Sequence, residues 1–207
     1  MADIPTIDDS NVLAGANQVI SFHHELSGLT VRFKAFDISY SESITNDWEE
    51  VVLPRRINRS YTWTNVIRSI SLGWNIPAFD INEAKQNLSN CSNLVKMMYP
   101  MTDGDGYISG GNPIWHLGIM NWAHNPASAN AGTGEDKSTM LAGFPSSFNF
   151  DIVGTDGYIY DGHDPYPKNI KCSMGYTVLL DDDLNFSWSS SGVWNGPGPF
   201  PWAADEG

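Results

Sequence analysis

Positive charge is scarce in this 207-residue chain. It has 11 Lys and Arg against 24 Asp and Glu, and a formal net charge of −13 at pH 7. A protein that grips a nucleic-acid backbone needs clustered Lys and Arg, and the densest basic stretch here is Arg55, Arg56 and Arg59. We therefore expect no direct grip on nucleic acid. An acidic wall could still line a passage for DNA, because it repels phosphate and keeps a strand from sticking.

Cysteines and long apolar runs are also few. Cys91 and Cys172 are far apart in the sequence and lack metal-ligand spacing, so neither a disulfide scaffold nor a zinc site is indicated. We predict that Cys91 is a buried free thiol. The sequence shows no apolar stretch of membrane-spanning length and no charged leader followed by an apolar run. It predicts a soluble protein made in the cytoplasm, without a membrane partner.

Local catalytic signatures are missing as well. The chain has no Gly-x-Ser-x-Gly elbow, no Gly-rich phosphate loop ending in Lys-Ser/Thr, and no dinucleotide fingerprint. Its five histidines show no His-Glu-x-x-His spacing, and His116 and His124 lie eight residues apart. We predict a protein that is not an enzyme and uses no metal or cofactor. A hydrolase with unrecognised carboxylates is the least favoured alternative.

Aromatic residues are plentiful while charged residues of both signs are few. Charged residues make up 17% of the chain and aromatic residues 12%, with eight Trp. A monomer of this size usually carries about a quarter charged residues, so the deficit indicates that partners cover part of the surface. The alternative is a surface that is polar only because it is rich in Asn and Ser.

Period-two alternation of apolar residues predicts a mainly β protein. In one segment Ile70, Leu72, Trp74 and Ile76 share a face, and small polar residues occupy the other face. The predicted strands are Gly28–Tyr40, Ile67–Ile76, Ser147–Val153, Tyr158–Tyr160 and Ile170–Leu180.

One amphipathic helix is predicted over residues 80–98. Asp80 and Glu83 have the spacing of a capping box, with Asp in the Ser/Thr position. Apolar residues then recur in steps of three and four, and the pattern stops before Pro100. The stripe comprises Ile81, Ala84, Leu88, Cys91, Val95 and Met98.

The polar and aromatic segment Ser41–Asn65 is too long for a tight turn between two strands. It forms either an extended loop or a long protruding hairpin that continues both strands. Arg and Trp are enriched at interface hot spots, although ordinary loop packing is an equally good explanation of each residue. The interface candidates are Trp48, Arg55, Arg56, Arg59 and Trp63.

These observations divide the chain into three parts. Residues 1–27 are predicted to be an N-terminal arm, and residues 28–183 a β domain that contains the helix at 80–98. Residues 184–207 form a C-terminal tail that is rich in Trp, Gly and Pro and has no periodicity.

Two stretches resemble the tail-tube-type baseplate proteins (tube initiator or hub class) of contractile-tailed bacteriophages. The first includes Val31-Arg-Phe-Lys-Ala-Phe, Trp48, Asn65-Val-Ile-Arg-Ser-Ile-Ser-Leu-Gly-Trp-Asn-Ile-Pro-Ala and Leu94-Val-Lys-Met-Met-Tyr-Pro. The second includes Phe148-Asn-Phe-Asp-Ile, Tyr166-Pro-Lys-Asn-Ile-Lys-Cys and Tyr176-Thr-Val-Leu. Together they cover about half of the chain. The Trp-rich C-terminus has no counterpart.

The resemblance implies a β-sandwich or barrel with a helix on one flank. It implies a structural virion protein of a phage tail, in the baseplate or tail tube. Copies would form a homo-oligomeric ring, a hexamer by this resemblance, that binds other tail proteins and lets DNA pass through its lumen.

A carbohydrate-binding β-sandwich is the alternative function. Indole rings could stack on sugars while Asn and Asp bind hydroxyl groups. The residues proposed for stacking are Trp115, Trp122, Trp194 and Trp202.

Overall fold

The computed structural model describes residues 19–34, 36–51, 59–100, 105, 107–108, 113–120, 122–123, 139–152, 154–179, 187–188 and 194–195. The elements are β1 (Val19–His24), β2 (Thr30–Lys34), β3 (Phe36–Val51), β4 (Ser60–Pro77), α2 (Ile81–Met97), β5 (Trp115–Ile119), β6 (Leu141–Ile152), the 3-10 turn η2 (Gly154–Asp156), β7 (Tyr158–Asp161), β8 (Asp164–Pro167), β9 (Asn169–Val178), β10 (Ser187–Trp188) and β11 (Trp194–Asn195).

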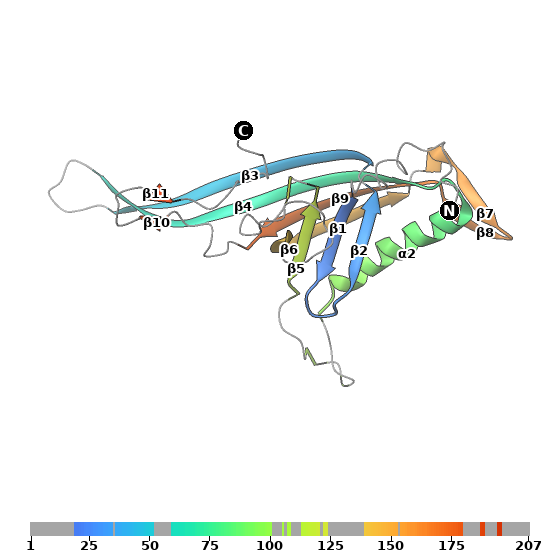
Figure 1. Cartoon of the computed structure of the whole chain (residues 1–207), viewed down its shortest axis with the longest axis horizontal. Helices are drawn as coiled ribbons and strands as arrows, with labels where there is room; N and C mark the ends of the chain where they lie inside the picture. The colour runs from blue at the N-terminus through green and yellow to red at the C-terminus, as the bar shows by residue number, and fades with distance from the viewer. Residues whose placement is uncertain are drawn as a thin grey trace.

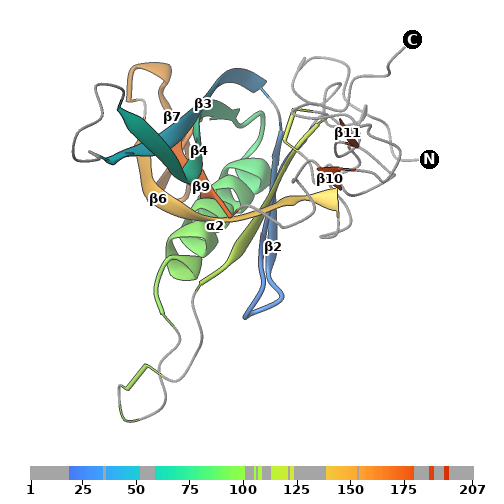
Figure 2. The same ribbon diagram turned by 90° about the vertical axis from the view of Figure 1, so that its left-hand side faces the viewer.

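Seven strands form one antiparallel sheet in the order β2-β1-β5-β6-β9-β4-β3 (Figure 1). Strands β2 and β3 follow each other in the chain but occupy opposite edges, so the sheet has to curl back on itself. The rings of Phe22 on β1 and Phe33 on β2 each lie 5.7 Å from the ring of Trp74 on β4. The two halves of the sheet therefore pack face to face, as in a sandwich or open barrel (Figure 2).

The predicted β fold with one amphipathic helix is confirmed, since α2 is the only α-helix of the described residues. The side chain of Asp80 accepts a hydrogen bond from the Glu83 N–H at 2.7 Å, and the Glu83 carboxylate accepts one from the Phe79 N–H at 2.7 Å. These two bonds satisfy amide groups that the start of a helix leaves unpaired. Ala84 and Cys91 of the predicted stripe are buried, whereas its other four residues are only partly buried, and the helix buries Leu94 and Met97 in its last turns.

The hydrophobic core follows the predicted alternation of β4 and β9. On β4, Ile70, Leu72, Trp74 and Ile76 are buried, and their register partners on β9 are buried as well. These partners are Tyr176, Met174, Cys172 and Ile170.

The two cysteines meet inside this core. Cys91 on α2 is buried and free, as predicted, and its thiol hydrogen-bonds with that of Cys172 on β9. That contact and burial raise the pKa of Cys172. Both thiols are therefore part of the packing between helix and sheet.

The prediction of one strand over Gly28–Tyr40 is wrong. The chain instead forms two strands, β2 and β3, which lie at opposite edges of the sheet. Near the start of β3, Asp37 has a left-handed φ of 48°. Asp tolerates this conformation better than most residues, and the side chain of Asn75 donates a hydrogen bond to the Asp37 carboxylate. The apolar residues shift from odd positions (Val31, Phe33) to even positions (Phe36, Ile38) across this crossing, a change of phase that the prediction of a single strand ignored.

The sheet also begins earlier than the arm predicted for residues 1–27 would allow. Strand β1 lies inside that range and pairs with both β2 and β5. Its Ile20 and Phe22 are buried, but Ser21 and His24 are buried too, which hides the alternation. The tail 184–207 lies outside the described residues, apart from the four positions of β10 and β11, and remains a prediction.

Gly143 on β6 leaves space for the side chain of Tyr176 on β9, which lies across β6 toward β5. The Tyr176 hydroxyl lies 2.9 Å from the carbonyl oxygens of both Trp115 and Leu141, so its single proton is donated to these two acceptors. A Cβ on Gly143 would lie 2.3 Å from the Thr177 carbonyl oxygen and 2.6 Å from the Tyr176 ring. No side chain fits there without moving backbone.

We expect Gly143→Ala to lower the free energy of unfolding by about 1–3 kcal/mol, the usual cost of overpacking. Gly73→Ala is the matched control on β4, because its added Cβ would meet nothing closer than 3.6 Å and should change stability by less than about 1 kcal/mol. Urea denaturation of both variants measures the difference, and equal stabilities would contradict this explanation.

Candidate assembly surface

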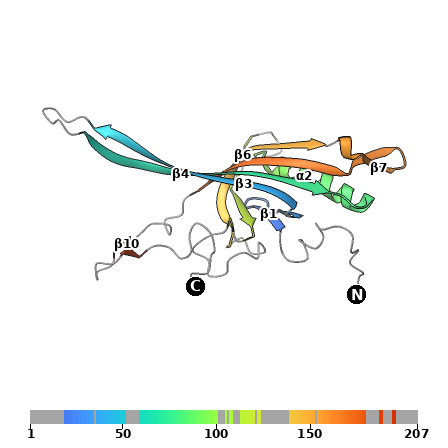
Figure 3. The ribbon, with the colours of Figure 1, turned by 90° about the horizontal axis from the view of Figure 1, so that it is seen from above.

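The segment Ser41–Asn65 is a long protruding hairpin, the second of the two predicted alternatives. Strands β3 and β4 pair from Phe36↔Asn75 out to Val51↔Ser60. Strand β9 accompanies β4 only as far as the Val178↔Arg68 pair. Beyond Arg68 the hairpin has two strands and extends away from the sheet (Figures 1 and 3). Both of its faces are therefore largely exposed.

Exposed aromatic side chains gather on this hairpin. Trp48 and Trp63 are register partners next to a bulge, and they are 60% and 51% exposed. Tyr61 lies two residues before Trp63 on β4, nearer the tip of the hairpin, and is also exposed. Large apolar groups that remain in water on a projecting element are typical of an interaction site.

The predicted interface residues have different outcomes. Trp48, Trp63 and Arg59 all lie on the projecting part of the hairpin. Arg59 Nη1 lies 3.0 Å from a carboxylate oxygen of Glu50 on the paired strand, and both groups are partly exposed. Arg55 and Arg56 fall outside the described residues. For all five residues, participation in an interface stays a prediction.

A buried ion pair anchors the base of the hairpin. Arg68 on β4 is 1% exposed and its Nε donates to the Glu42 carboxylate on β3. The Tyr40 hydroxyl donates to the same carboxylate at 2.9 Å, and the Trp122 ring packs at a tilt with its centroid 5.8 Å from that of the Tyr40 ring. Burial, and then the Glu42 charge, raise the pKa of Tyr40. This network fixes the direction in which the hairpin leaves the sheet.

We expect Arg68→Met to destabilise the fold by about 3–5 kcal/mol, because it leaves the Glu42 carboxylate buried without its cation. Arg59→Met is the matched control, since it breaks an exposed pair worth only about 0–1 kcal/mol. Combining Arg68→Met with Glu42→Leu should recover most of the loss. Chemical denaturation of the three variants tests this, and a double variant as unstable as the single one would contradict it.

Two edges of the layer β3-β4-β9-β6 have no partner strand among the described residues. Strand β3 has β4 on one side only, along its 16 residues. Strand β6 pairs with β5 only at Leu141–Gly143, so Ser147–Ile152 is paired with β9 alone. Unpaired edges offer a row of backbone N–H and C=O groups to a further strand.

The face of this layer opposite to the core is small, polar and almost uncharged. Register places Ser41, Ser71 and Gly175 in one cross-strand row, and Ser39, Gly73, Ser173 and Asn149 in the next. In these rows, charged residues appear only toward one end, where Lys171 on β9 and Asp151 on β6 are register partners. The remaining small polar members of this face are Ser43, Ser69, Thr177 and Ser147.

Three of the histidines lie on β1 and β5. The rings of the cross-strand partners His23 and His116 are 5.9 Å apart, and His116 Nε2 lies 3.0 Å from a Glu25 carboxylate oxygen. In the described ranges, no group of three or more His, Cys, Asp or Glu residues could hold a metal ion. His24 is buried on the other face, and burial, followed by the charge of His23, lowers its pKa.

We expect His24 to make stability depend on pH. A lowered pKa in the folded state means that the unfolded chain takes up more protons as the pH falls through the ordinary value of 6.5, so stability is full above that pH and decreases below it. His24→Leu should flatten the change in melting temperature between pH 7 and pH 5. Thermal unfolding of both proteins across this range tests the expectation, and parallel curves would contradict it.

The tryptophans proposed for sugar stacking have different environments where the structure describes them. Trp115 is fully buried in the core, whereas Trp122 is 38% exposed and packs against Tyr40. The side chains of Trp194 and Trp202 lie outside the described residues. Trp115 is therefore unavailable to a sugar, and one partly exposed indole does not by itself define a carbohydrate site.

Comparisons with known proteins give only distant similarities. No protein-family model matches the sequence. No curated protein matches it either. The fold is similar to a chain of the PVC sheath-tube complex of an extracellular contractile injection system, in the extended state, with a TM-score of 0.34, 10% identity, and 79% and 86% of the two chains covered.

A chain in the tail of an empty GTA particle, with C6 symmetry, is similar with a TM-score of 0.32 and 10% identity over 81% of this chain and 94% of that chain. TM-scores this low do not establish a shared fold, so the function proposed below rests on the chain's own geometry. None of the described helices has the length and apolar character required to cross a membrane.

The sequence offered the hairpin as one of two alternatives for Ser41–Asn65, and it did not reveal the open edge of β6. Alternation in Phe148, Phe150 and Ile152 indicated a strand, and nothing in that pattern shows which side of the strand lacks a neighbour. The Ser and Gly residues opposite the core were visible as the polar half of each strand. Their alignment into continuous rows required the register between strands.

Proposed function

We propose that this chain is a non-enzymatic structural subunit of a bacteriophage tail, part of the tail tube or of the baseplate as a tube initiator or hub. Copies would form a homo-oligomeric ring, sixfold by the resemblance noted above, that binds neighbouring tail proteins. The observation that carries the proposal is the pair of open edges on one four-stranded layer, together with the projecting aromatic hairpin.

Ring closure would join the open edge of β3 to the open edge of β6 on the next copy. The layer has four antiparallel strands, so β3 and β6 run in opposite directions. Copies related by a rotation about an axis along the strands would then continue the antiparallel pattern at every junction. Closing the ring satisfies both edges at once and removes a site of uncontrolled aggregation.

The small polar face would line the passage. It lies opposite the core, so it would face inward when layers join with their helices outside. The middle rows of hydroxyl groups and glycines carry no basic side chain and would offer a phosphate backbone no ion pair, and Lys171, in the row at one end of the face, lies beside Asp151. The acidic excess first suggested for such a wall is not found on its middle rows. It includes Asp47, Glu49 and Glu50 on the hairpin instead.

The hairpin would reach a neighbouring subunit or the next ring. It leaves the layer at Arg68 and carries Trp48 and Trp63 well beyond the last residue of β9. Its buried ion pair and continuous register keep it in a defined direction, which reduces the ordering cost of binding. Arg59 would contribute at the same contact.

Blocking one edge should abolish ring formation while leaving the monomer folded. Phe150 is a half-exposed residue on the open part of β6, and Phe150→Lys would place a charge where the next copy's β3 has to pair. We expect negative-stain images and sedimentation of the wild type to show closed rings, and those of the variant to show monomers with an unchanged circular dichroism spectrum.

Tyr160→Lys is the matched control, because Tyr160 is exposed on the separate β7–β8 hairpin. It should form rings like the wild type. A wild-type protein that remains monomeric up to high concentration would contradict the proposed function, and so would rings that persist with Phe150→Lys.

A further inference from the structure

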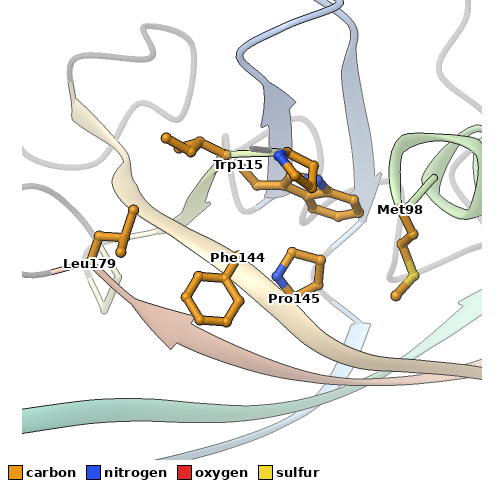
Figure 4. A pocket seen from close by; sticks show the side chains of 7 residues that line it. Met98, Trp115, Phe144, Pro145 and Leu179 are labelled. Carbon is orange, nitrogen blue, oxygen red and sulfur yellow. The ribbon is translucent and has the colours of Figure 1, made fainter. Parts of the chain in front are cut away.

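The open edge of β6 has a defined start. Pairing with β5 ends at Gly143, and an apolar pocket of about 360 Å³ that is lined in part by Phe144 and Pro145 lies at this point (Figure 4). Pro145 has no backbone N–H to donate, and the register between β6 and β9 shifts between Pro145 and Ser147. The part of β6 that can pair regularly with a further strand is therefore residues 147–152.

The edge of β3 is longer, so it can receive this segment in more than one register. Strand β3 has 16 residues, and Asn149 lies in the same cross-strand row as Ser39. If the rows of two copies were in line, Asn149 of one copy would lie opposite Ser39 of the next, and Asp151 would lie opposite Asp37. Like charges directly opposite each other are destabilising. This aligned register is therefore unfavourable.

Closure of a sheet also requires a displacement along the strands. In closed barrels the strands tilt by about 35–45° to the axis, so the ring axis runs only approximately along the strands and each junction between copies is displaced. One copy contributes four strands, about 19 Å of sheet at a spacing of about 4.8 Å, and each residue advances about 3.3 Å. Displacements of two, four and six residues therefore give tilts of about 19°, 35° and 46°. Odd displacements would turn the side chains of the two strands to opposite faces, so only four or six residues fit.

The lengths of the two strands decide the direction of the displacement. Moved four residues toward the hairpin, Asn149 lies opposite Ser43, and all of residues 147–152 lie opposite residues 40–45 of β3. Moved four residues the other way, Asn149 would be level with a position before Phe36, the first residue of β3, and most of the segment would have no partner. The edge of β3 extends only toward the hairpin, so the displacement has that direction.

We propose that β6 of one copy pairs with β3 of the next in a register displaced by four residues toward the hairpin, which places Phe148 opposite Ile44. The inference rests on the proposed ring and specifies the junction between its copies. Ile44 is 49% exposed although it lies on the core side of β3, opposite the buried Arg68. Phe148 lies on the same side of β6, opposite the buried Met174. Aromatic and β-branched residues form favourable cross-strand pairs, and this pair would cover an apolar side chain that a single copy leaves in water.

The neighbouring pairs agree with this register. Ile152, which is 46% exposed, lies opposite Tyr40 on the core side. On the polar face Asp151 lies opposite Ser41, so the like-charge contact of the aligned register is absent. The remaining pairs of this face join uncharged Ser, Asn and Thr residues.

A displacement of six residues fits less well. It would place Phe148 opposite Asn46 and Ile152 opposite Glu42, so two of the three apolar side chains on the core side of the β6 segment would face polar ones. At four residues only Phe150 has a polar partner, Glu42, and the carboxylate of Glu42 is already held within its own copy. Apolar matching therefore favours four residues over six.

The test is disulfide cross-linking between opposite positions on the polar face. Displacements of zero, two, four and six residues are reported by four double variants, which combine Asn149→Cys with Ser39→Cys, Ser41→Cys, Ser43→Cys or Thr45→Cys. A disulfide needs Cα atoms within about 7 Å of each other, whereas three strand spacings, about 14 Å, separate β3 from β6 inside one copy. The natural Cys91 and Cys172 are buried. Under mild oxidation we expect a ladder of covalent oligomers on non-reducing electrophoresis for the pair with Ser43→Cys, and about fivefold less product for the other three.

A second measurement tests the apolar contact. Ile44→Asn should raise the concentration needed for half-assembly by about tenfold, because it removes the cross-strand partner of Phe148. Ile67→Asn is the matched control, since Ile67 is 40% exposed on the polar side of the inner strand β4, and it should leave that concentration unchanged.

The outcomes separate the register from the ring. Rings that cross-link most strongly through Ser39→Cys, Ser41→Cys or Thr45→Cys, or through none of the four pairs, would overturn the register and leave the proposed function intact. Equal effects of Ile44→Asn and Ile67→Asn would also overturn it. A wild type that never assembles, as seen by mass photometry, would overturn both proposals.

Discussion

The rest of this structure depends on the crossing between β2 and β3. These strands are consecutive in the chain yet lie at opposite edges of the sheet, and a single position separates them. The sheet can satisfy that connection only by curling until its edges approach each other. Burial of Phe22 and Phe33 against Trp74 then provides the apolar contact that holds the curl.

Curling decides which edges remain open. Strand β6 begins beside β5 and ends beside β9 alone, because β5 is only five residues long and belongs to the other half of the fold. Among the described residues, strand β3 has β4 as its only neighbour. The same constraint therefore closes the core and produces two complementary edges. Within the described part of one copy both edges lack a partner strand, and an unpaired edge is a liability unless something covers it.

The sequence predicted those features that depend on residues close in the chain. Helix α2 had a cap, a stripe and a stop, all of which act within a few residues, and its predicted range was right to within one residue at each end. The buried faces of β4 and β9 were equally clear because period two was unbroken. Strand β1 was missed since buried Ser21 and His24 interrupt its apolar pattern.

Features that depend on strand order could not be predicted from local sequence patterns. The break between Lys34 and Phe36 coincides with a one-residue shift in the apolar pattern, but nothing local shows that the two strands lie at opposite edges of the sheet. The pocket brings together residues from 98 to 179, so no spacing in the sequence points to it. The interface candidates on the hairpin were accessible because Trp in a polar segment is locally unusual, whereas the edge that would pair with a second copy was not.

The position of the charges follows from the same architecture. The face of the layer that packs on the core has little room for charge. Most described acidic residues lie on the hairpin, the turns and the helix, and the exceptions within the seven-stranded sheet are Asp37 and Glu42 on β3 and Asp151 on β6. The net charge of −13 makes copies of this chain repel one another in solution, so any assembly between them has to rest on specific contacts such as strand pairing and apolar burial.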